Sequence, residues 1–330
     1  MKRWLSFILA LVLCFCLVAC GEGAEPAPTE ETQIPTQQQP EETVPTEEST
    51  STPILYKVTD DAGNTAYLFG SIHVGKEDFY PLPDYVINAY ESSDALAVEL
   101  DILAFEKDIK AQTEALMPLI YMDGTTIKDH IPQELYDQAV VAMTKLEVYD
   151  PMLDYYCPAM WSSLIDSVQS EKTGADASLG IDIHMLNRAK ADGKTILEIE
   201  SAAFQYQMLA DFPEALQILL LEGSIESLND EEGAKEAMNT MMELWAAGDE
   251  EALLDFLYEE TDENDPNLEL YEAYDKAMVT DRNISMADFA EEVLASGQTV
   301  FICVGALHVI GEGGMADLLA QRGYDVVRVQ

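Results

Sequence analysis

The sequence predicts an α/β fold in which a central mixed, partly parallel β-sheet is flanked by helices, with large helical insertions. Apolar runs of strand character occupy residues 67–74 and 301–309, and each contains a glycine that is followed three residues later by a histidine. Short strand-like runs alternate with segments of helical periodicity. The hydrophobic content, 48% of 330 residues, is ordinary for a packed core.

The N-terminus has the pattern of a lipoprotein signal peptide over residues 1–19. Lys2 and Arg3 precede an apolar run over residues 5–18, which is shorter than the roughly 20 residues of a spanning helix. The Leu-x-Ala-Cys ending resembles a bacterial lipobox, which implies cleavage before Cys20 and lipid attachment to its thiol. We expect an extracytoplasmic protein that is lipid-anchored to the bacterial cell membrane. An uncleaved short anchor would leave the domain on the same side.

Residues 20–52 are predicted to be a lipidated cysteine followed by a disordered acidic tether. Residues 21–52 contain eight glutamates, many Thr, Pro and Gln residues, and no Lys, Arg or aromatic residue. Such a segment cannot bury enough apolar surface to offset the entropy lost on ordering. The folded domain is therefore expected over residues 53–330.

The charge balance is strongly acidic, with 17 Lys and Arg against 62 Asp and Glu and a net charge of -45. Nucleic-acid binding depends on Lys and Arg contacts to phosphates, so we expect no nucleic-acid partner. We interpret the excess as a solvated surface that keeps the protein soluble. The oligomeric state is left open by the sequence.

The folded part is expected to begin with a β-hairpin. Residues 54–58 and 66–69 have strand character and flank a polar turn at residues 60–64. The second strand leads to Gly70 and His73, which places an imidazole at the end of a strand.

A helix over about residues 84–92 then leads to a short apolar strand over residues 95–98, which ends at Glu99. The next segment, about residues 102–180, shows helical spacing of apolar residues with breaks at glycine and proline. It holds no cluster of chemistry-bearing residues, so we interpret it as a helical insertion. The sequence does not determine whether this insertion acts as a lid.

Strands and helices alternate again in the second half of the chain. A helix over residues 180–191 ends at Gly193, and a strand over residues 194–199 ends at Glu200. The other expected elements are an acidic helical block over 213–260, helices over 268–278, 285–295 and 314–322, and strands over 300–304 and 325–329. The strand over 300–304 leads to His308.

His73 and His308 thus stand in the same setting, three residues after a glycine at a strand end. Ligands of open α/β sheets lie beyond the carboxyl ends of the strands, so the two imidazoles should meet over one crevice. Together with Glu99 they form a plausible set of ligands for a divalent cation such as Zn, Mn, Fe or Co. Three protein ligands leave positions open for water, which a bound metal can acidify for hydrolysis.

Two further residues extend this candidate site. Glu200 would act as a general base or support the ligands, and Arg282 would stabilise a developing oxyanion. Each residue also has an ordinary structural interpretation: a histidine after a strand is commonly hydrogen-bonded, a glutamate can begin a helix, and an arginine can pair with an acid. The other histidines, His130 and His184, lie in helical surroundings and are interpreted as structural or exposed.

A series of motifs resembles the TraB/GumN family. These motifs are Leu68-Phe69-Gly70-Ser71-Ile72-His73, Pro81-Leu82-Pro83, Glu99-Leu100-Asp101, Gly180-Ile181-Asp182 with Gly193-Lys194, Glu200 with Gln205, Arg282-Asn283, Gly305-Ala306-Leu307-His308 and Arg322-Gly323-Tyr324. The family is similar to the Tiki metalloproteases and is grouped with erythromycin esterases and haem-binding ChaN proteins. The resemblance implies an α/β core with a helical insertion and a metal-dependent protease site at His73, Glu99 and His308. It also implies Mn or Co as the metal, and functional positions at Glu200 and Arg282.

We therefore expect a surface-anchored, metal-dependent hydrolase, and more specifically a peptidase that acts on extracellular peptides or proteins. Mn or Co is the expected metal, with Zn or Fe as alternatives. Two other functions stay open: a non-catalytic lipoprotein that sequesters a peptide or haem, and a metal-free esterase in which a histidine transfers the proton. Loss of Glu99 should abolish metal binding but leave haem or peptide binding largely intact.

Overall fold

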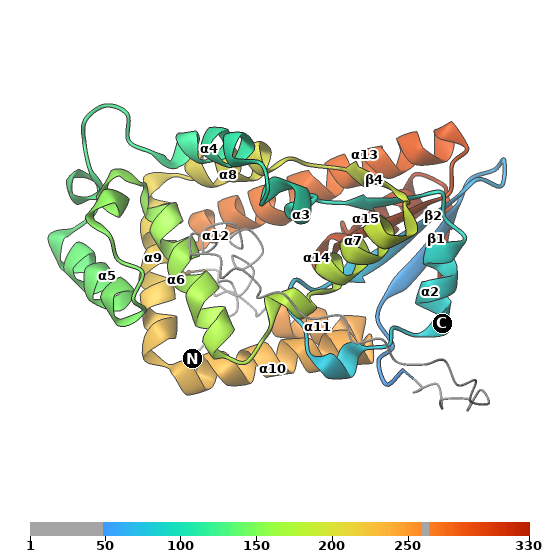
Figure 1. Cartoon of the computed structure of the whole chain (residues 1–330), viewed down its shortest axis with the longest axis horizontal. Coiled ribbons are helices and arrows are strands. Elements are labelled where there is room, and N and C mark those ends of the chain that lie inside the picture. The colour runs from blue at the N-terminus through green and yellow to red at the C-terminus, as the bar shows by residue number, and fades with distance from the viewer. Residues whose placement is uncertain (1–48, 259–263) are drawn as a thin grey trace, which may run out of the picture.

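The computed structural model describes residues 49–258 and 264–330 (Figure 1). The predicted signal peptide, the predicted lipidation site Cys20 and most of the predicted tether lie outside these residues. Within the described part of the chain, no helix combines the length and the apolar character needed to cross a membrane. Residues 49–52, at the end of the predicted tether, contact the fold: the Thr52 N–H donates to the Ala246 carbonyl at 2.7 Å.

The core of the fold is a six-stranded mixed sheet, as the sequence predicts. The strands are β1 (Leu55–Thr59), β2 (Thr65–Ser71), β3 (Ala95–Val98), β4 (Thr195–Glu198), β5 (Val300–Gly305) and β6 (Asp325–Arg328), in the order β4-β3-β5-β2-β1-β6. The four strands from β4 to β2 are parallel, whereas β1 pairs antiparallel with β2 and with β6. The carboxyl ends of β2, β3, β4 and β5 therefore meet at one edge of the sheet.

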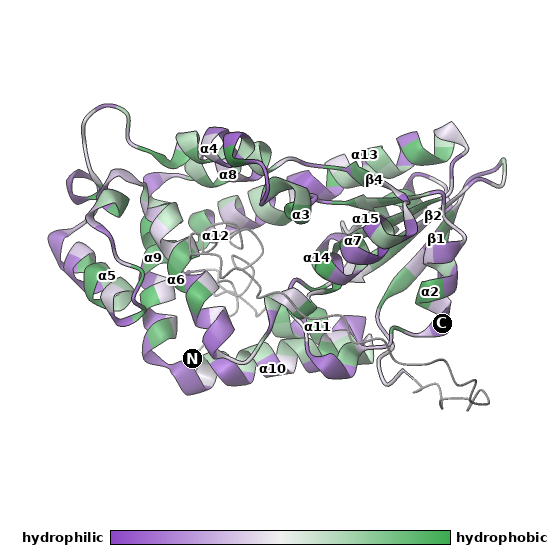
Figure 2. Cartoon of the chain, viewed as in Figure 1, coloured by the Kyte–Doolittle hydropathy of each residue, from purple (hydrophilic) through white to green (hydrophobic). Residues whose placement is uncertain are grey.

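The strands in the middle of the sheet are more buried than the edge strand β4. Every residue of β3 and all but the last residue of β5 are buried, whereas no residue of the edge strand β4 is. Parallel strands that are covered on both faces are buried along their whole length. This burial explains why the sequences of β3 and β5 are unbroken apolar runs. Figure 2 shows hydrophobic colour along the strands and hydrophilic colour on the outer sides of the helices.

Four helices cover the sheet. They are α2 (Asp84–Glu91), α7 (Ile181–Asp192), α13 (Asp281–Ser296) and α15 (Met315–Gln321). α2 contacts β2 and β5, α7 contacts β3, β4 and β5, α13 contacts β2, and α15 contacts β1 and β6. The bounds of α2, α7 and α15 agree with the predicted helices to within one residue at each end.

α13 begins earlier than the sequence predicts. The expected helix over residues 285–295 starts in the structure at Asp281, and it continues α12 (Leu268–Asp275) through a π-helical turn over Lys276–Thr280. Single π-helical turns inside helices are frequent at functional sites. The earlier start places Arg282 in the first turn of α13, on its buried face and next to the π-helical turn.

The predicted insertion is helical, but it packs with helices from later in the chain. It contains α3 (Ile102–Phe105), α4 (Ile109–Leu116), α5 (Gln133–Lys145) and α6 (Pro158–Lys172). α6 packs along α9 (Glu214–Asn229), and α4 packs on α8 (Ala202–Ala210). Figure 1 shows α4, α5, α6, α8 and α9 gathered beside the sheet at one end of the molecule, where they contribute to two hydrophobic clusters separate from that of the sheet.

The predicted acidic block over residues 213–260 forms three helices in its described part: α9, α10 (Glu231–Ala247) and α11 (Glu250–Leu257). α10 ends at Gly248, which adopts a left-handed φ of 63°. The Trp245 indole N–H donates to the Gly70 carbonyl at 2.9 Å, and this bond attaches α10 to β2 just before the strand ends.

Candidate functional site

The parallel strands bring three predicted site residues together. His73 follows the end of β2 by two residues, Glu99 comes directly after β3, and His308 lies in the short helix α14 (Ala306–Val309) directly after β5. Because β3, β5 and β2 are neighbours in the sheet, their ends lie side by side. The sequence-based expectation that these side chains face one crevice agrees with this arrangement.

Gly305 lies between the side chains of His73, Glu99 and His308. A Cβ atom at this glycine would lie 3.4 Å from Glu99 Oε1, 3.5 Å from His308 Cδ2 and 3.7 Å from His73 Nε2. The absence of a side chain at this position keeps the space between the three groups open. The Gly305 N–H also donates to Glu99 Oε1 at 2.7 Å, which fixes one carboxylate oxygen.

His73 is oriented by a carboxylate on α7. Its Nδ1 lies 2.6 Å from Asp182 Oδ2, while its Nε2 is buried and has no hydrogen-bond partner in the described chain. Burial by itself would lower the pKa of His73, but the charge and hydrogen bond of Asp182 outweigh this effect and raise the pKa to about 9. The second ring nitrogen is thus turned into the site and is not used by the fold.

His308 is oriented by an amide on α13. Its Nδ1 lies 2.7 Å from Asn283 Oδ1, and the Asn283 side-chain amide donates to the Gly313 carbonyl at 2.9 Å, which fixes the direction of the amide. The Nε2 atom of His308 faces Glu99 Oε1 at 3.9 Å. Burial, and next the positive charge of Arg282, lower the pKa of His308 to about 3, which favours the neutral imidazole.

Arg282 joins the two predicted glutamates. Its Nη2 donates to Glu99 Oε2 at 2.6 Å, and its Nε and Nη2 donate to the two oxygens of Glu200 at 2.7 and 2.8 Å. The Gln205 side-chain amide donates to Glu200 at 2.9 Å. Burial by itself would raise the pKa of Glu99, but the charge of Arg282 and the two histidines lower it to about 2. Glu200 is placed to hold Arg282, which agrees with a supporting role more directly than with proton transfer.

The other two histidines lie apart from this group. His130 belongs to the helical insertion, where it stacks on Tyr121 and its Nδ1 lies 2.9 Å from Glu214 Oε2. His184 lies on α7 and stacks on Tyr80 with the ring centroids 4.4 Å apart. Both arrangements agree with the structural roles expected from the sequence.

Two cavities adjoin the site, and Ser71 and His73 line both. One has a volume of about 90 Å³ and is lined mainly by apolar side chains. The other has a volume of about 300 Å³, and Glu99, Asp182 and Gln205 are among the residues that line it. His73 therefore stands between an apolar and a more polar cavity, whereas His308 lines only the apolar one.

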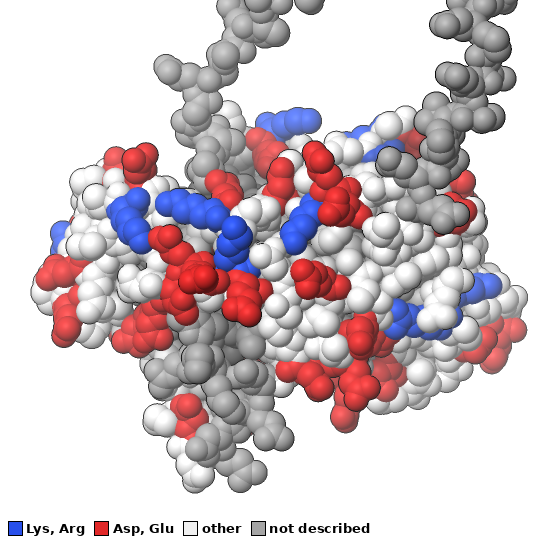
Figure 3. Space-filling model, turned by 90° about the horizontal axis from the view of Figure 1, so that it is seen from below, with Lys and Arg blue, Asp and Glu red and all other residues white. Residues whose placement is uncertain are grey.

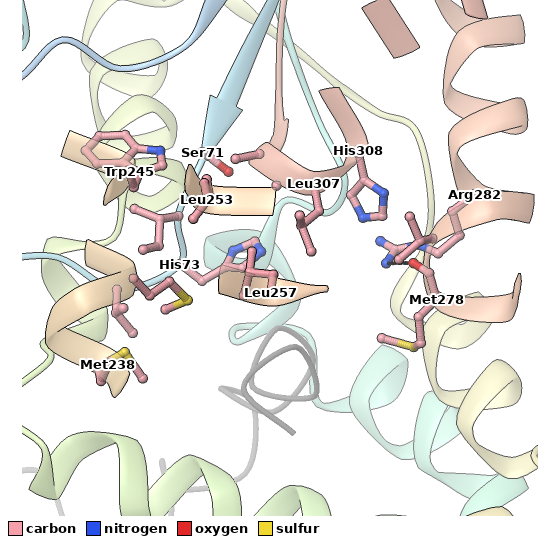
Figure 4. A pocket seen from close by; sticks show the side chains of 16 residues that line it. Ser71, His73, Met238, Trp245, Leu253, Leu257, Met278, Arg282, Leu307 and His308 are labelled. Atoms are coloured by element: carbon pink, nitrogen blue, oxygen red, sulfur yellow. Dashed lines mark hydrogen bonds between the residues drawn. The ribbon is translucent and has the colours of Figure 1, made fainter. Parts of the chain in front are cut away.

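Figure 4 shows the apolar cavity from close by. Trp245, Leu253 and Met238 lie on one side of it, and His308 and Arg282 lie on the other. Figure 3 shows a wider face of the molecule, over which acidic side chains are spread with lysines and arginines among them. This distribution agrees with the expected acidic surface, and the lack of a nucleic-acid partner stays a prediction.

The donors of the site suit a divalent cation in kind, but they stand apart. Two imidazoles with hydrogen-bonded Nδ1 atoms and one carboxylate form an ordinary ligand set with supporting contacts. Ligands of a tetrahedral ion lie about 3.4 Å from one another, whereas His308 Nε2 and Glu99 Oε1 are 3.9 Å apart. Over residues 49–258 and 264–330, no group of three or more His, Cys, Asp or Glu side chains has the spacing to hold an ion.

The chain belongs to the TraB/PrgY/gumN family, whose family model matches residues 54–328. Two relatives are each named "Uncharacterized protein YbaP". The protein from Shigella flexneri is 27% identical over 266 residues, which is 79% of this chain and 90% of the relative. The protein from Escherichia coli (strain K12) is 27% identical over 257 residues, which is 77% of this chain and 87% of the relative. No solved structure matches the chain.

Sequence reasoning did not assign roles to Asp182, Asn283 and Gly305. Asp182 comes at the start of a helix, where a carboxylate is ordinary. Asn283 adjoins Arg282, and Gly305 opens the second Gly-x-x-His motif. All three residues therefore belong to motifs of the family resemblance, but the sequence does not indicate what their side chains or backbone contact. Their contacts depend on the rotation of α7 and α13 against the sheet, and local periodicity does not specify that rotation.

His308 should make the stability of the fold sensitive to acid. Its pKa is lowered to about 3 from 6.5. The contribution of the neutral His308 to the free energy of unfolding is therefore complete above pH 6.5 and is lost as the pH falls toward 3. At pH 4.5 the loss is on the order of 3 kcal/mol, because each pH unit below 6.5 costs about 1.4 kcal/mol. We expect His308→Gln to lose less free energy of unfolding than the wild type between pH 7 and 4.5, measured by urea denaturation in EDTA. Equal losses in the two proteins would contradict the buried, neutral His308.

Proposed function

We propose that this protein is a metal-dependent hydrolase, and more specifically a peptidase that acts on peptides or proteins outside the cell. His73, Glu99 and His308 are the proposed ligands, with Mn or Co favoured and Zn or Fe as alternatives. The observation that carries the proposal is the orientation of the two histidines. Each uses Nδ1 for a contact to the fold; His73 turns Nε2 toward the space at Gly305, and His308 turns Nε2 toward Glu99 Oε1.

The charges around the site support a divalent cation. Glu99, Asp182 and Glu200 carry three formal negative charges and Arg282 carries one positive charge, so two negative charges are uncompensated while both histidines are neutral. The side chains of Glu99 and Glu200 are 8% and 5% exposed, and buried charges require compensation. A divalent cation would bring the formal charge of the group to zero, whereas a proton on His73 alone would not.

The residues of the chain have separate roles in this proposal. A bound divalent ion would supply Lewis acidity, which polarises a carbonyl and acidifies water. Asp182 and Asn283 fix the rings of His73 and His308, and Gly305 leaves room for the reacting group. Arg282 is a permanent, buried cation that lines the apolar cavity with both histidines, and in this proposal it would stabilise negative charge that develops on a substrate oxygen.

A metal-free hydrolase is the second candidate, and the contact between His73 and Asp182 favours it. A carboxylate on Nδ1 and an unoccupied Nε2 are the arrangement of a histidine that transfers protons, and with its pKa raised to about 9 His73 would act as a general base only at alkaline pH. The separation of His308 Nε2 from Glu99 Oε1 also exceeds that of two ligands of one tetrahedral ion. In this candidate Arg282 would provide the positive charge for the developing oxyanion.

Turnover of a peptide library tests the hydrolase. The full chain in lipid nanodiscs would be incubated with the library in Mn²⁺, Co²⁺, Zn²⁺ or EDTA, and cleavage would be read by mass spectrometry. We expect cleavage that requires a metal and that falls about 100-fold or more in His73→Ala, His308→Ala and Glu99→Gln, because each removes a ligand. The matched control is His130→Ala combined with His184→Ala, which removes two histidines outside the site and should keep the rate.

Each result of that assay assigns a function. Cleavage in EDTA at an undiminished rate would contradict the metal-dependent mechanism and support the metal-free hydrolase. Peptide binding without cleavage under any condition would contradict both hydrolases and support a sequestering protein.

Gly305→Ala should separate catalysis from stability. The backbone at this glycine has a φ of -49°, and the added Cβ would meet its nearest neighbour at 3.4 Å, an ordinary contact. We therefore expect the free energy of unfolding to change by less than about 1 kcal/mol. The cleavage rate should fall by about 10-fold or more, because the methyl group occupies the space between the histidines and Glu99. A variant with the wild-type rate would show that this space is not where the reaction occurs.

A further inference from the structure

We propose that the apolar cavity beside His73 and His308 is a subsite for one bulky apolar side chain of the substrate. This inference rests on the proposed peptidase and names the kind of residue that it selects. The subsite adjoins the reacting groups directly, because His73, His308 and Gly305 are among the residues that line it.

The walls of the cavity are apolar and come from helices outside the sheet. Six side chains of α10, α11 and the π-helical turn form much of the lining: Met238, Met241, Trp245, Leu253, Leu257 and Met278. The indole N–H of Trp245 is already used by the Gly70 carbonyl, so the ring offers the cavity an apolar surface. Methionine side chains are flexible and adapt to groups of different shape.

His308 and Arg282 lie across the cavity from Trp245, Leu253 and Met238 (Figure 4), and the backbone of a bound peptide would lie on their side. The polar side chains in its lining are those of Ser71, His73, Arg282 and His308, all from the candidate site. The Nε and Nη2 donors of Arg282 are taken by Glu99 and Glu200, and its Nη1 donates to the Met278 carbonyl at 3.2 Å, which leaves one Nη1 hydrogen for a substrate oxygen. A substrate would therefore place an apolar side chain among the methionines and its amide beside the histidines.

The size and charge of the cavity define the occupant further. A volume of about 90 Å³ holds on the order of six waters at about 10–15 Å³ each, which matches a Leu, Met or Phe side chain better than Ala. No Lys, Asp or Glu is among the described residues that line the cavity. A basic substrate side chain would lose its hydration there without a carboxylate in the lining, and an acidic one would meet Arg282, which is already paired with Glu99 and Glu200.

A series of peptides tests the subsite. Fluorescently labelled hexapeptides that differ at one position, with Leu, Met, Phe, Ala, Ser or Asp, would be given to the full chain in lipid nanodiscs. Binding would be measured by fluorescence anisotropy and cleavage by mass spectrometry. With the varied residue placed at each position in turn, we expect one position to prefer Leu, Met or Phe over Ser and Asp by about 10- to 100-fold.

Two variants and one control link this preference to the cavity. Met241→Trp should fill the cavity and reduce the preference for Phe over Ala by about 10-fold, and Leu257→Arg should remove the discrimination against Asp. Val141→Arg is the matched control, because Val141 is 68% exposed on α5 in the helical insertion. Thermal melts would establish that each variant is folded.

The outcomes distinguish the subsite from the proposed function. Equal binding of the Leu and Asp peptides, no binding of any peptide, or an unchanged preference in both folded cavity variants would overturn the subsite, even if cleavage occurs. An apolar preference in binding without cleavage would support the subsite and contradict the hydrolase.

Discussion

The pairing of Arg282 with Glu99 and Glu200 is the interaction on which the site depends. The arginine side chain is 1% exposed and reaches from α13 to carboxylates that follow β3 and β4. Removal of one partner from a buried ion pair commonly costs about 3–5 kcal/mol, because it leaves a charge uncompensated. Both carboxylates are needed to hold the guanidinium; Gly305 bonds the remaining oxygen of Glu99, and Gln205 adds a second bond to Glu200 Oε2. This network fixes the carboxyl edge of the sheet against the helix that also carries Asn283.

The sheet and the helices contribute differently to the site. The ends of the parallel strands β2, β3 and β5 deliver His73, Glu99 and His308, so the reacting groups are attached to the most buried part of the fold. The helices α7 and α13 supply the side chains that orient the two imidazoles. In contrast, α10 and α11 supply the apolar cavity beside them. The proposed metal ligands therefore follow strands of the sheet, whereas Arg282 and the side chains proposed to select the substrate belong to helices outside it.

The sequence predicts much of the fold because its strands are apolar runs that end at turn residues. All six strands occur where such runs were found, and His73, Glu99 and His308 converge because each follows a strand of one parallel set. The packing of α6 on α9 could not be predicted, since it joins segments that are far apart in the chain. The same holds for the contacts of Arg282, which depend on where the π-helical turn begins. The sequence does not predict the apolar cavity, because the methionines that line it have the same spacing as ordinary core residues.

The metal content of the purified full chain tests the central claim most directly. The protein would be prepared without a histidine tag, supplied with Mn²⁺ or Co²⁺, dialysed and analysed by elemental mass spectrometry beside the double variant His73→Ala and His308→Ala. The account predicts about one ion per chain in the wild type and none in the double variant, because the two imidazoles are the proposed anchors of the ion. A wild-type protein that retains no Mn, Co, Zn or Fe, or a double variant that retains as much as the wild type, would contradict it.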